Sequence, residues 1–351
     1  MNKWNISVLS IALSCSVHAQ SIEFIGTIPL AISASDDLHR SFSKTQIVYV
    51  QNVRLSEDAQ RVLKDRLDRI PGDLGVQAES DPLLPSSINL GMNNTPVLDQ
   101  GAHGSCVTFA ITGAFDAVLG KGDYISQLCS LELGAYLQKH RRAAYSGWDG
   151  STGPDVLEQL NSYGIVTKSY QLDYGCAVVK RYPLTNEKNT GNPMSISEYT
   201  ANSLALSFAG WEVLADAEDV FSDDFNPVSL LRAVKKNLRE GRRVTFGMLL
   251  DDSVGEAGAV AKFKKNYDTW VLTPAIVKKI KKGGLKAGHE MIIIGYDDQA
   301  QAWTNDGTVS KGLFIIRNSW GKQAGDGGNF YISYDYFKAL CDEAQAIVPK
   351  A

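Results

Sequence analysis

The hydrophobic pattern of the chain changes about halfway along, and this change limits the possible folds more than any other feature. Residues 106–119, CVTFAITGAFDAVL, form a nearly continuous apolar run of helical length, which predicts a helix buried on most sides. Further helices are predicted at 154–163 and 227–240, because each range begins at a proline and is followed by a glycine. Four short apolar runs separated by Gly or Asp predict strands at 243–250, 290–296, 312–318 and 329–334. A helical part followed by a β part indicates an α+β protein.

The first 19 residues have the features of a secretory signal peptide. Lys3 precedes an apolar stretch from Ile6 to Cys15, and small residues lie near Ala19, after which we expect cleavage. A lipoprotein signal at Cys15 fits less well, because Leu13 stands where a small residue is usual. No later apolar run reaches about 18 residues, so no membrane span is predicted. We expect an exported protein, secreted or periplasmic and bacterial, with a eukaryotic lysosomal or secreted protein as the alternative.

The charge of the chain argues against a nucleic-acid partner. The formal net charge is −4 and the sequence pI is about 5.8. A protein that binds phosphates along a nucleic acid needs a basic face. We therefore expect that the chain does not bind nucleic acid.

Cysteine use is informative because the chain is expected to leave the cytosol. Removal of the signal peptide leaves Cys106, Cys129, Cys176 and Cys341. In an exported protein the expected fate of cysteines is pairing. If one of the four is a working thiol, one bridge and one spare cysteine remain, and we expect the bridge to join Cys129 to Cys176.

The segment after the signal peptide predicts a small unit of its own. Residues 45–53 are rich in β-branched side chains and predict a strand. A helix follows Ser56, since apolar residues recur there at intervals of three and four until Pro71 ends the pattern. Residues 73–95 contain scattered Gly, Pro, Ser and Asn and predict an exposed linker to a larger domain.

Cys106 stands where a thiol can be activated. It opens the buried helix, and the positive end of a helix dipole favours thiolate over thiol. A cysteine in this position can also be only a small buried hydrophobic residue. A base and an orienting group elsewhere in the chain would favour the catalytic interpretation.

Two later motifs supply the missing groups. His289 follows Gly288 and opens the most apolar strand, and Asn318 ends another strand within the run RNSWG. An amide oxygen that accepts from imidazole fixes the tautomer of the ring, and Trp320 would exclude water from that bond. Gln100, six residues before Cys106, offers a side-chain N–H donor that can hold an oxyanion beside the Cys106 backbone N–H.

Taken together, the Gln100 to Cys106 interval, the Gly288-His289 pair and the Asn318-Ser319-Trp320-Gly321 run resemble the papain-like cysteine peptidases. The resemblance covers roughly residues 90–340. It implies a two-lobed fold with the active-site cleft between a helical lobe and an antiparallel, barrel-like β lobe. It further implies that Cys106 is the nucleophile, His289 the base, Asn318 the orienting group, Gln100 the oxyanion donor and Trp320 the shield of the His–Asn bond.

The resemblance also implies a domain plan. After the signal peptide (1–19) comes a short pro-segment (20–85), which would fill the cleft of the peptidase domain (86–351) until it is removed. The alternative is a structural extension that is never cleaved. The helical lobe spans about 100–210 and the β lobe about 211–351. We expect a monomer made as a zymogen, without a metal ion or an organic cofactor.

The chain departs from the family pattern around the cleft. His103 and Val107 stand where the family has a cysteine and an aromatic residue. The half-cystine that pairs with the former is also missing, since the matching stretch reads Trp148-Asp149-Gly150-Ser151. The residue that binds the substrate backbone is therefore left open among Gly150, Ser151 and Gly153.

Two further observations concern the rim of the cleft. His289 and Asn318 lie farther from Cys106 than the family's spacing of about 130 to 150 residues, which indicates insertions near 185–225, 251–285 and 298–311. Glu290 occupies a position that lines the P2 pocket in relatives. Its carboxylate would either favour a basic substrate side chain or pair with nearby lysines.

The function predicted from the sequence is hydrolysis of peptide bonds by an exported thiol protease. A catalytically silent binding module on the same fold is the main alternative, although all four catalytic residue types are present. Acyl transfer to an amine acceptor in place of water is chemically permitted at the same site. Covalent labelling of Cys106 by a thiol-directed epoxide separates the enzyme from the silent module.

Overall fold

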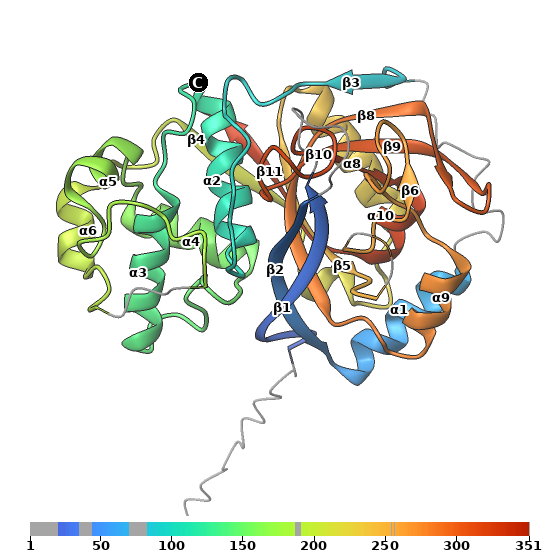
Figure 1. Cartoon of the computed structure of the whole chain (residues 1–351), viewed down its shortest axis with the longest axis horizontal. Coiled ribbons are helices and arrows are strands. Elements are labelled where there is room, and N and C mark those ends of the chain that lie inside the picture. Colours follow the sequence, from blue (N-terminus) through green and yellow to red (C-terminus); the bar gives the residue numbers. More distant parts are fainter. Residues whose placement is uncertain are drawn as a thin grey trace, which may run out of the picture.

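The structure, a computed structural model, describes residues 20–34, 44–69, 83–186, 191–253, 255 and 257–350. The predicted signal peptide (1–19) and residues 73–82 of the predicted linker lie outside the described residues. A helical lobe, a β lobe and a leading hairpin make up the described chain, and the hairpin lies between the two lobes (Figure 1).

Five helices lie in the described part of the helical lobe. They are α2 (Cys106–Leu119), α3 (Gln127–Lys139), α4 (Gly153–Tyr163), α5 (Lys168–Tyr174) and α6 (Ile196–Asn202). Helix α2 is buried from its first residue to Ala117, as its continuous apolar sequence predicts. Cys129 at the start of α3 forms a disulfide with Cys176, which follows α5, across 47 residues.

The β lobe contains most of the strands, and four helices pack around them. Its elements are β3 (Ser87–Asn89), β4 (Ala209–Ala215), α7 (Ala217–Val220), α8 (Pro227–Arg239), β5 (Val244–Leu250), β6 (Ala261–Lys262), β7 (Thr269–Trp270), α9 (Pro274–Lys281), β8 (Ala287–Thr304), β9 (Val309–Arg317), β10 (Asn329–Ser333), α10 (Tyr334–Leu340) and β11 (Cys341–Pro349). The strand order is β4-β11-β5-β8-β6-β7-β10-β9, and β9 pairs again with β8. The path from β8 through β6, β7, β10 and β9 thus closes on itself, which confirms the predicted barrel-like α+β layout.

Strand β8 differs from its prediction in length. The sequence predicts a short strand at 290–296, whereas β8 runs for 18 residues to Thr304. The expected insertion at 298–311 is the continuation of the β8–β9 hairpin, in which Gln301 to Trp303 pair with Lys311 to Val309. Residues 87–89 of the predicted linker form β3, which pairs with β8 at Asp297 to Gly295.

The two lobes meet where α2 packs on β8. Apolar side chains of both elements share one buried cluster that includes Val107, Ile111, Ile292 and Ile294. Burial of such side chains contributes about 1.5–3 kcal/mol each. Cys106 belongs to the same cluster, so the contact between the lobes also fixes the start of the helix.

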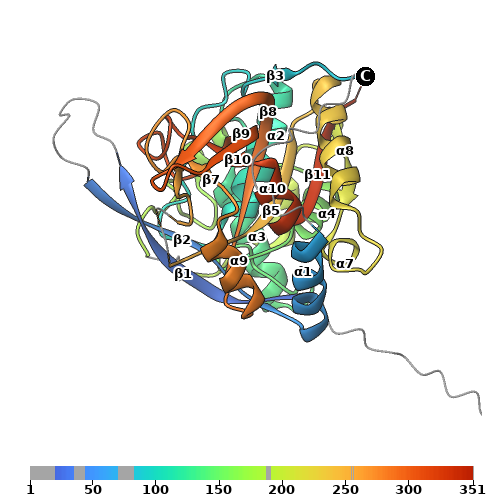
Figure 2. The same ribbon diagram turned by 90° about the vertical axis from the view of Figure 1, so that its right-hand side faces the viewer.

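The leading segment is a hairpin followed by a helix. Strand β1 (Ile22–Ala34) pairs along its length with β2 (Lys44–Leu55), and α1 (Glu57–Arg69) follows. The predicted strand–helix unit is therefore β2 and α1, and β1 is an additional strand. Figure 2 shows the last part of β1 and the first part of β2 extending beyond the β lobe, and α1 lies beside α9.

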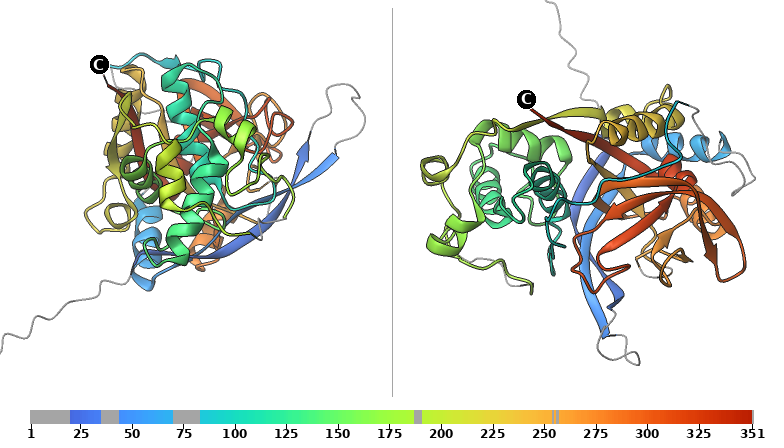
Figure 3. Two further views of the ribbon diagram at one scale, coloured as in Figure 1. Left: turned by 90° about the vertical axis from the view of Figure 1, so that its left-hand side faces the viewer. Right: turned by 90° about the horizontal axis from the view of Figure 1, so that it is seen from above.

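The hairpin and α1 share the hydrophobic core of the β lobe. Val48 and Val50 of β2 are fully buried, and Leu63 of α1 is 3% exposed, all within the cluster that also contains Trp320. Strand β2 joins the sheet itself, because Gln51 pairs with Gly288 and Asn52 with Ala287 of β8. Seen from above, the hairpin separates the helical lobe from the β lobe (Figure 3).

The described part of the chain contains no helix that is long and apolar enough to span a membrane.

We expect Leu63→Ala in α1 to destabilise the whole chain. The change removes a buried side chain from the core shared with the β lobe, so the free energy of unfolding should fall by about 2–4 kcal/mol. Urea unfolding of the full chain measures it. Asp65→Ala, an exposed change on the same helix, should stay within about 0.5 kcal/mol. Equal small effects of both changes would show that α1 is only loosely attached.

Candidate active site

Cys106 is held, fully buried, at the first position of α2. Burial raises the pKa of its thiol to about 12, and the backbone N–H groups of Glu290 and Val107 lower it only in part. Cys106 shares a buried cluster with Ile292 and Ile294 of β8, the strand that carries His289. The two lobes thus bring Cys106 and His289 to one place.

His289 is bonded to Asn318 through one nitrogen only. Its Nε2 lies 2.8 Å from Asn318 Oδ1, while its Nδ1 has no hydrogen-bond partner among the described residues. The Asn318 oxygen also accepts from the backbone N–H of Ser319 at 2.7 Å, so it is an acceptor and Nε2 must carry the proton. The neutral ring therefore leaves Nδ1 free to take a proton.

Trp320 covers the His289 ring. The two rings stack with centroids 4.6 Å apart and planes at 23°, and Trp320 is fully buried. Burial lowers the pKa of His289 to about 4, and the bond to Asn318 opposes this shift in part. Burial therefore favours the neutral form of the Cys106 thiol and of the His289 imidazole alike.

Gln100 directs its amide N–H groups at two carbonyl oxygens. Its Nε2 donates to Tyr49 O of β2 and to His103 O, both at 2.9 Å. Its Oε1 accepts from Ser319 Oγ at 2.7 Å, which fixes the orientation of the amide. A carbonyl of the leading hairpin thus occupies the donor that the sequence assigns to an oxyanion.

Backbone pairing holds the loop before Cys106 against the Asn-Ser-Trp-Gly turn. The N–H of Gln100 donates to Ser319 O at 2.8 Å, and the N–H of Gly321 donates to Leu98 O at 3.0 Å. Both bonds cross from one lobe to the other, so they fix the position of Gln100 relative to Asn318. The residues of the three sequence motifs therefore form one rigid cluster.

The predicted substrate-binding residues of the helical lobe face the hairpin or the β lobe. The backbone oxygen of Ser151 accepts from Gln51 Nε2 at 2.9 Å. A Cβ built on Gly150 would lie 3.3 Å from the Cβ of Phe24 in β1. The N–H of Gly153 donates to Glu343 Oε1 of β11 at 2.8 Å.

Glu290 lines a small cavity beside His289. The cavity has a volume of about 30 Å³, and Gln51 and Phe24 of the hairpin cover it. The Glu290 carboxyl group interacts with the side chains of Glu343 and Thr245, and burial raises its pKa well above the ordinary value. Pairing of Glu290 with a lysine, expected as one alternative, is not observed, since no lysine lines the cavity.

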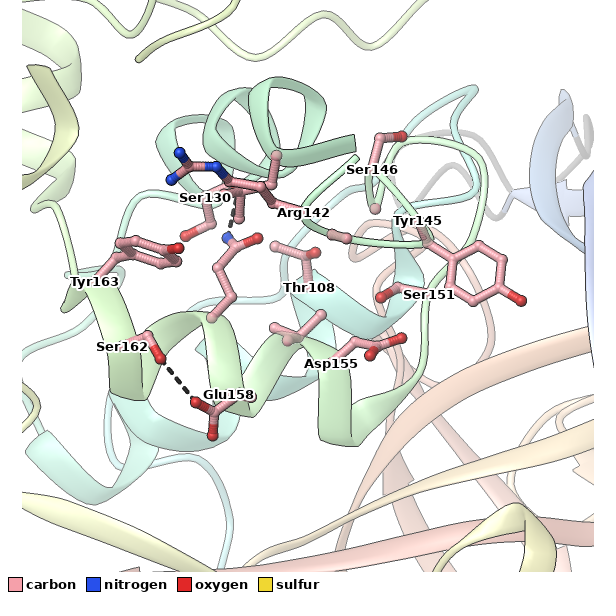
Figure 4. Close-up of a pocket in the computed structure, with 15 residues that line it drawn as sticks. Thr108, Ser130, Arg142, Tyr145, Ser146, Ser151, Asp155, Glu158, Ser162 and Tyr163 are labelled. Atoms are coloured by element: carbon pink, nitrogen blue, oxygen red, sulfur yellow. Dashed lines mark hydrogen bonds between the residues drawn. The ribbon is translucent and has the colours of Figure 1, made fainter. Parts of the chain in front are cut away.

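A larger cavity of about 260 Å³ lies within the helical lobe, behind the wall that carries Ser151. Figure 4 shows Ser151 and Tyr145 on one side of it and Tyr163 on the other, with Ser162 donating to Glu158. Ser151 is the one predicted site residue that lines both this cavity and the wall of the cleft.

Three further residues belong to the site and are not identified from the sequence. Ser319 lies inside the RNSWG run, which could have indicated its role in orienting Gln100. Tyr182 donates to Gln100 O at 2.9 Å and contacts Ser105 Oγ at 2.8 Å, and no local pattern marks it. Glu343 reaches the site from β11 and carries no motif.

Comparisons with known proteins agree with this geometry. The family model described as papain family cysteine protease matches residues 250–349, a range that includes His289 and Asn318. The thiol protease aleurain of Arabidopsis thaliana is 23% identical over 255 residues, which cover 70% of this chain and 54% of aleurain. The chain thus spans about half the length of this curated relative. The resemblance predicted from the three motifs is confirmed by these matches.

Solved structures of cysteine proteases are also similar to the chain. Xylellain from Xylella fastidiosa is 17% identical with a TM-score of 0.46, over 76% of this chain and 87% of xylellain. Digestive procathepsin L 3 from Tenebrio molitor larvae is 17% identical with a TM-score of 0.46, over 84% and 79%. Bromelain from Ananas comosus is 16% identical with a TM-score of 0.45, over 76% and 99%.

We expect the Cys106 thiol of the full chain to react slowly at pH 7. It is fully buried and its pKa is about 12, so the thiolate fraction is small. Iodoacetamide should modify Cys106 at least about a hundredfold more slowly than free cysteine, as measured by peptide mapping. The unfolded chain should react at both Cys106 and Cys341, the free cysteines of the described residues. Rapid modification of folded Cys106 would contradict a covered thiol.

Proposed function

We propose that this papain-like chain hydrolyses peptide bonds as a cysteine peptidase, with Cys106 as nucleophile and His289 as base. The observation that supports the proposal most is the hydrogen bond between His289 Nε2 and Asn318 Oδ1, which leaves His289 Nδ1 without a hydrogen-bond partner. His289 lies on β8, against which the start of α2 packs with Cys106. A base oriented by a third group next to a thiol is the arrangement that nucleophilic catalysis requires.

In the proposed reaction, the proton of Cys106 passes to His289 Nδ1 and the sulfur attacks the substrate carbonyl carbon. Gln100 Nε2 and the backbone N–H of Cys106 hold the oxyanion. The C–N bond then breaks, and the imidazolium gives its proton to the leaving amine. Water attacks the thioester with His289 as base, the acid leaves, and the thiol regains its proton.

The supporting residues hold these groups in place. Asn318 keeps the His289 ring in one tautomer, and Trp320 shields that bond from water. Gly150, Ser151 and Gly153 would bind the substrate backbone on the opposite wall. The oxygen of Ser151 already accepts a hydrogen bond from the hairpin strand that lies there.

We further propose that residues 20–85 are a pro-segment of the peptidase domain 86–351. Strand β2 crosses the site, pairs with β8 next to His289 and places Tyr49 O on the Gln100 donor. A substrate carbonyl needs the same donor, so the hairpin and the substrate exclude each other. We propose that the zymogen is exported to a secreted or periplasmic location in a bacterium as a monomer, and that cutting near 75–88 begins its maturation.

We expect the matured protein to hydrolyse peptides and to lose this activity through single changes at the site. Cys106→Ala should abolish hydrolysis and epoxide labelling, because no other nucleophile is in place. Gln100→Ala should lower kcat about 10²–10³-fold by removing one oxyanion donor. Fluorogenic peptide hydrolysis measures both effects. Gln138→Ala, an exposed glutamine on α3, is the matched control and should leave kcat within about twofold. Undiminished hydrolysis by Cys106→Ala would refute the proposal.

We expect Gln51→Ala to raise the basal activity of the uncut chain. It removes the buried bond from Gln51 to Ser151 O, worth about 1 kcal/mol, so the hairpin should leave the cleft about five- to tenfold more often. Arg54→Ala, an exposed change on the same strand, should alter basal activity less than about twofold. An uncut wild-type chain as active as the cut one would show that residues 20–85 do not inhibit.

A further inference from the structure

Ser105 immediately precedes α2 but does not cap it. A serine in this position usually accepts a hydrogen bond from the backbone N–H of the second or third helical residue. The side chain of Ser105 makes no such bond. In the described part of the helical lobe, the other helices each begin after a Ser or Thr whose side chain does accept one, namely Ser126, Thr152, Thr167 and Ser195. The start of α2 therefore lacks a cap that its sequence could provide.

The hydroxyl group of Ser105 is bonded to Tyr182 instead. Its Oγ lies 2.8 Å from the Tyr182 hydroxyl oxygen, which lies 2.9 Å from Gln100 O. A tyrosine hydroxyl has one proton and a backbone carbonyl only accepts, so Tyr182 donates to Gln100 O and Ser105 donates to Tyr182. Burial raises the pKa of Tyr182 above its ordinary value, so the hydroxyl group keeps this proton.

Aromatic side chains fix the position of the Tyr182 ring. The ring stacks on Trp148 with centroids 5.7 Å apart and planes at 11°. His103 and Phe109 contact it edge-on, with centroids 5.7 Å and 4.9 Å away. Stacked and edge-on contacts of this kind stabilise the packing of aromatic rings beyond their burial. The hydroxyl group is therefore held beside Ser105.

A second contact attaches the same loop to the same segment. The N–H of Ala102 donates to Leu184 O at 2.9 Å. A Cβ on Gly101 would lie 2.4 Å from that oxygen, and Gly101 has a φ of 55°. Only glycine meets both conditions without strain. The loop before α2 is therefore attached to Tyr182 and Leu184 along its length.

The backbone N–H groups at the start of α2 influence the nucleophile. The N–H of Val107 bonds to the Cys106 sulfur and lowers the pKa of the thiol. Val107 is the second helical residue, so its N–H is one of the two that a serine cap takes. Ser105 is fully buried, and its hydroxyl group, once released from Tyr182, needs a new partner in the protein. A bond from the Val107 N–H would supply that partner and would withdraw the donor from the sulfur.

We propose that Tyr182 is a positioning residue of the active site, whose hydroxyl group keeps Ser105 off the first turn of α2 and so leaves the backbone N–H of Val107 to the sulfur of Cys106. The inference rests on the proposed peptidase function and adds a residue to it. Tyr182 acts through other residues, since its hydrogen bonds go to Ser105 and to Gln100 O. The helix forgoes the stability of a cap, and the thiolate gains a donor.

Tyr182→Phe tests the proposal on the matured protein, because it removes the hydroxyl group and keeps the ring. Alkylation of Cys106 by iodoacetamide is followed as a function of pH by peptide mapping. The apparent pKa of the thiol should rise by about one unit, the effect of losing one hydrogen bond to a charged group. With less thiolate, kcat should fall about tenfold while KM changes less than about threefold. An apparent pKa equal to that of the wild type would overturn the proposal.

A second change separates this role from a purely structural one. Adding Ser105→Ala to Tyr182→Phe removes the hydroxyl group that competes for Val107, so the apparent pKa of Cys106 should return to within about 0.3 unit of the wild-type value. Ser105→Ala alone should stay in the same range, since Tyr182 still donates to Gln100 O. If Tyr182 only stabilised the loop, a further cavity at Ser105 could not restore the thiol. A pKa that stays raised in the double variant would contradict the proposed role.

Tyr199→Phe is the matched control. Tyr199 is fully buried in the same lobe, and its hydroxyl group donates to Gly164 O at 3.1 Å. Its loss should lower the free energy of unfolding about as much as Tyr182→Phe does, but it should leave the apparent pKa of Cys106 and kcat unchanged. Because kcat is expressed per epoxide-labelled site, a smaller folded fraction does not alter it. Equal rises of the pKa in both variants would show that any lost buried hydroxyl group has this effect, and the proposal would fall.

Failure of the peptidase function itself gives a different result. In that case no peptide is hydrolysed, whereas the pH profile of Cys106 alkylation still reports the effect of Tyr182. Hydrolysis by the wild type, together with an unchanged alkylation profile in Tyr182→Phe, rejects only the role of Tyr182.

Discussion

The packing of α2 on β8 is the contact on which the rest of the site depends. It buries the apolar face of the helix against Ile292 and Ile294, and in doing so it brings Cys106 at the start of α2 to the strand that carries His289. The backbone bonds between Leu98–Gln100 and Ser319–Gly321 then fix the rotation of one lobe on the other. Neither lobe holds a complete set of reacting groups, so the site exists only where the lobes meet.

The hairpin uses the same meeting place, and its position changes the chemistry there. With β2 in the cleft, the thiol and the imidazole are both excluded from water, and burial favours the neutral form of each. An ion pair between them needs solvent or substrate polarity that the covered cleft does not offer. On the proposed function, the leading segment would oppose catalysis in two ways: Tyr49 O takes a hydrogen bond from the proposed oxyanion donor Gln100, and the covered cleft favours the neutral thiol of Cys106.

The sequence predicts the parts of this structure that depend on local pattern. Helix α2, the strand that begins near His289 and the RNSWG turn are each marked by a continuous run of residues, and the structure places them together. Strand β1 escapes prediction because Gly26 and Pro29 interrupt its apolar pattern. Both are tolerated there, since the register shifts between Phe24 and Gly26 and β1 pairs only with β2, which leaves one edge free for a proline. The approach of Asp342 and Glu343 to Glu290 depends on three strands pairing in the right register, and no short motif encodes it.

Burial acts in opposite directions on the two kinds of titrating group around the cleft. The pKa of His289 falls to about 4, so its contribution to the stability of the closed form is complete above pH 6.5 and is lost as the pH falls toward 4. The pKa of Glu343 rises to about 7, so its contribution is complete below pH 4.5 and is lost as the pH rises toward 7. Burial also raises the pKa values of Glu290 and Asp342 in the same cavity, so a rise in pH weakens the contribution of the three carboxyl groups while that of His289 grows. A cut after α1 would leave in place the hydrophobic core that Val48, Val50 and Leu63 share with the β lobe. On the proposed maturation, release of the hairpin would therefore require either its further digestion or a ligand that competes for the cleft.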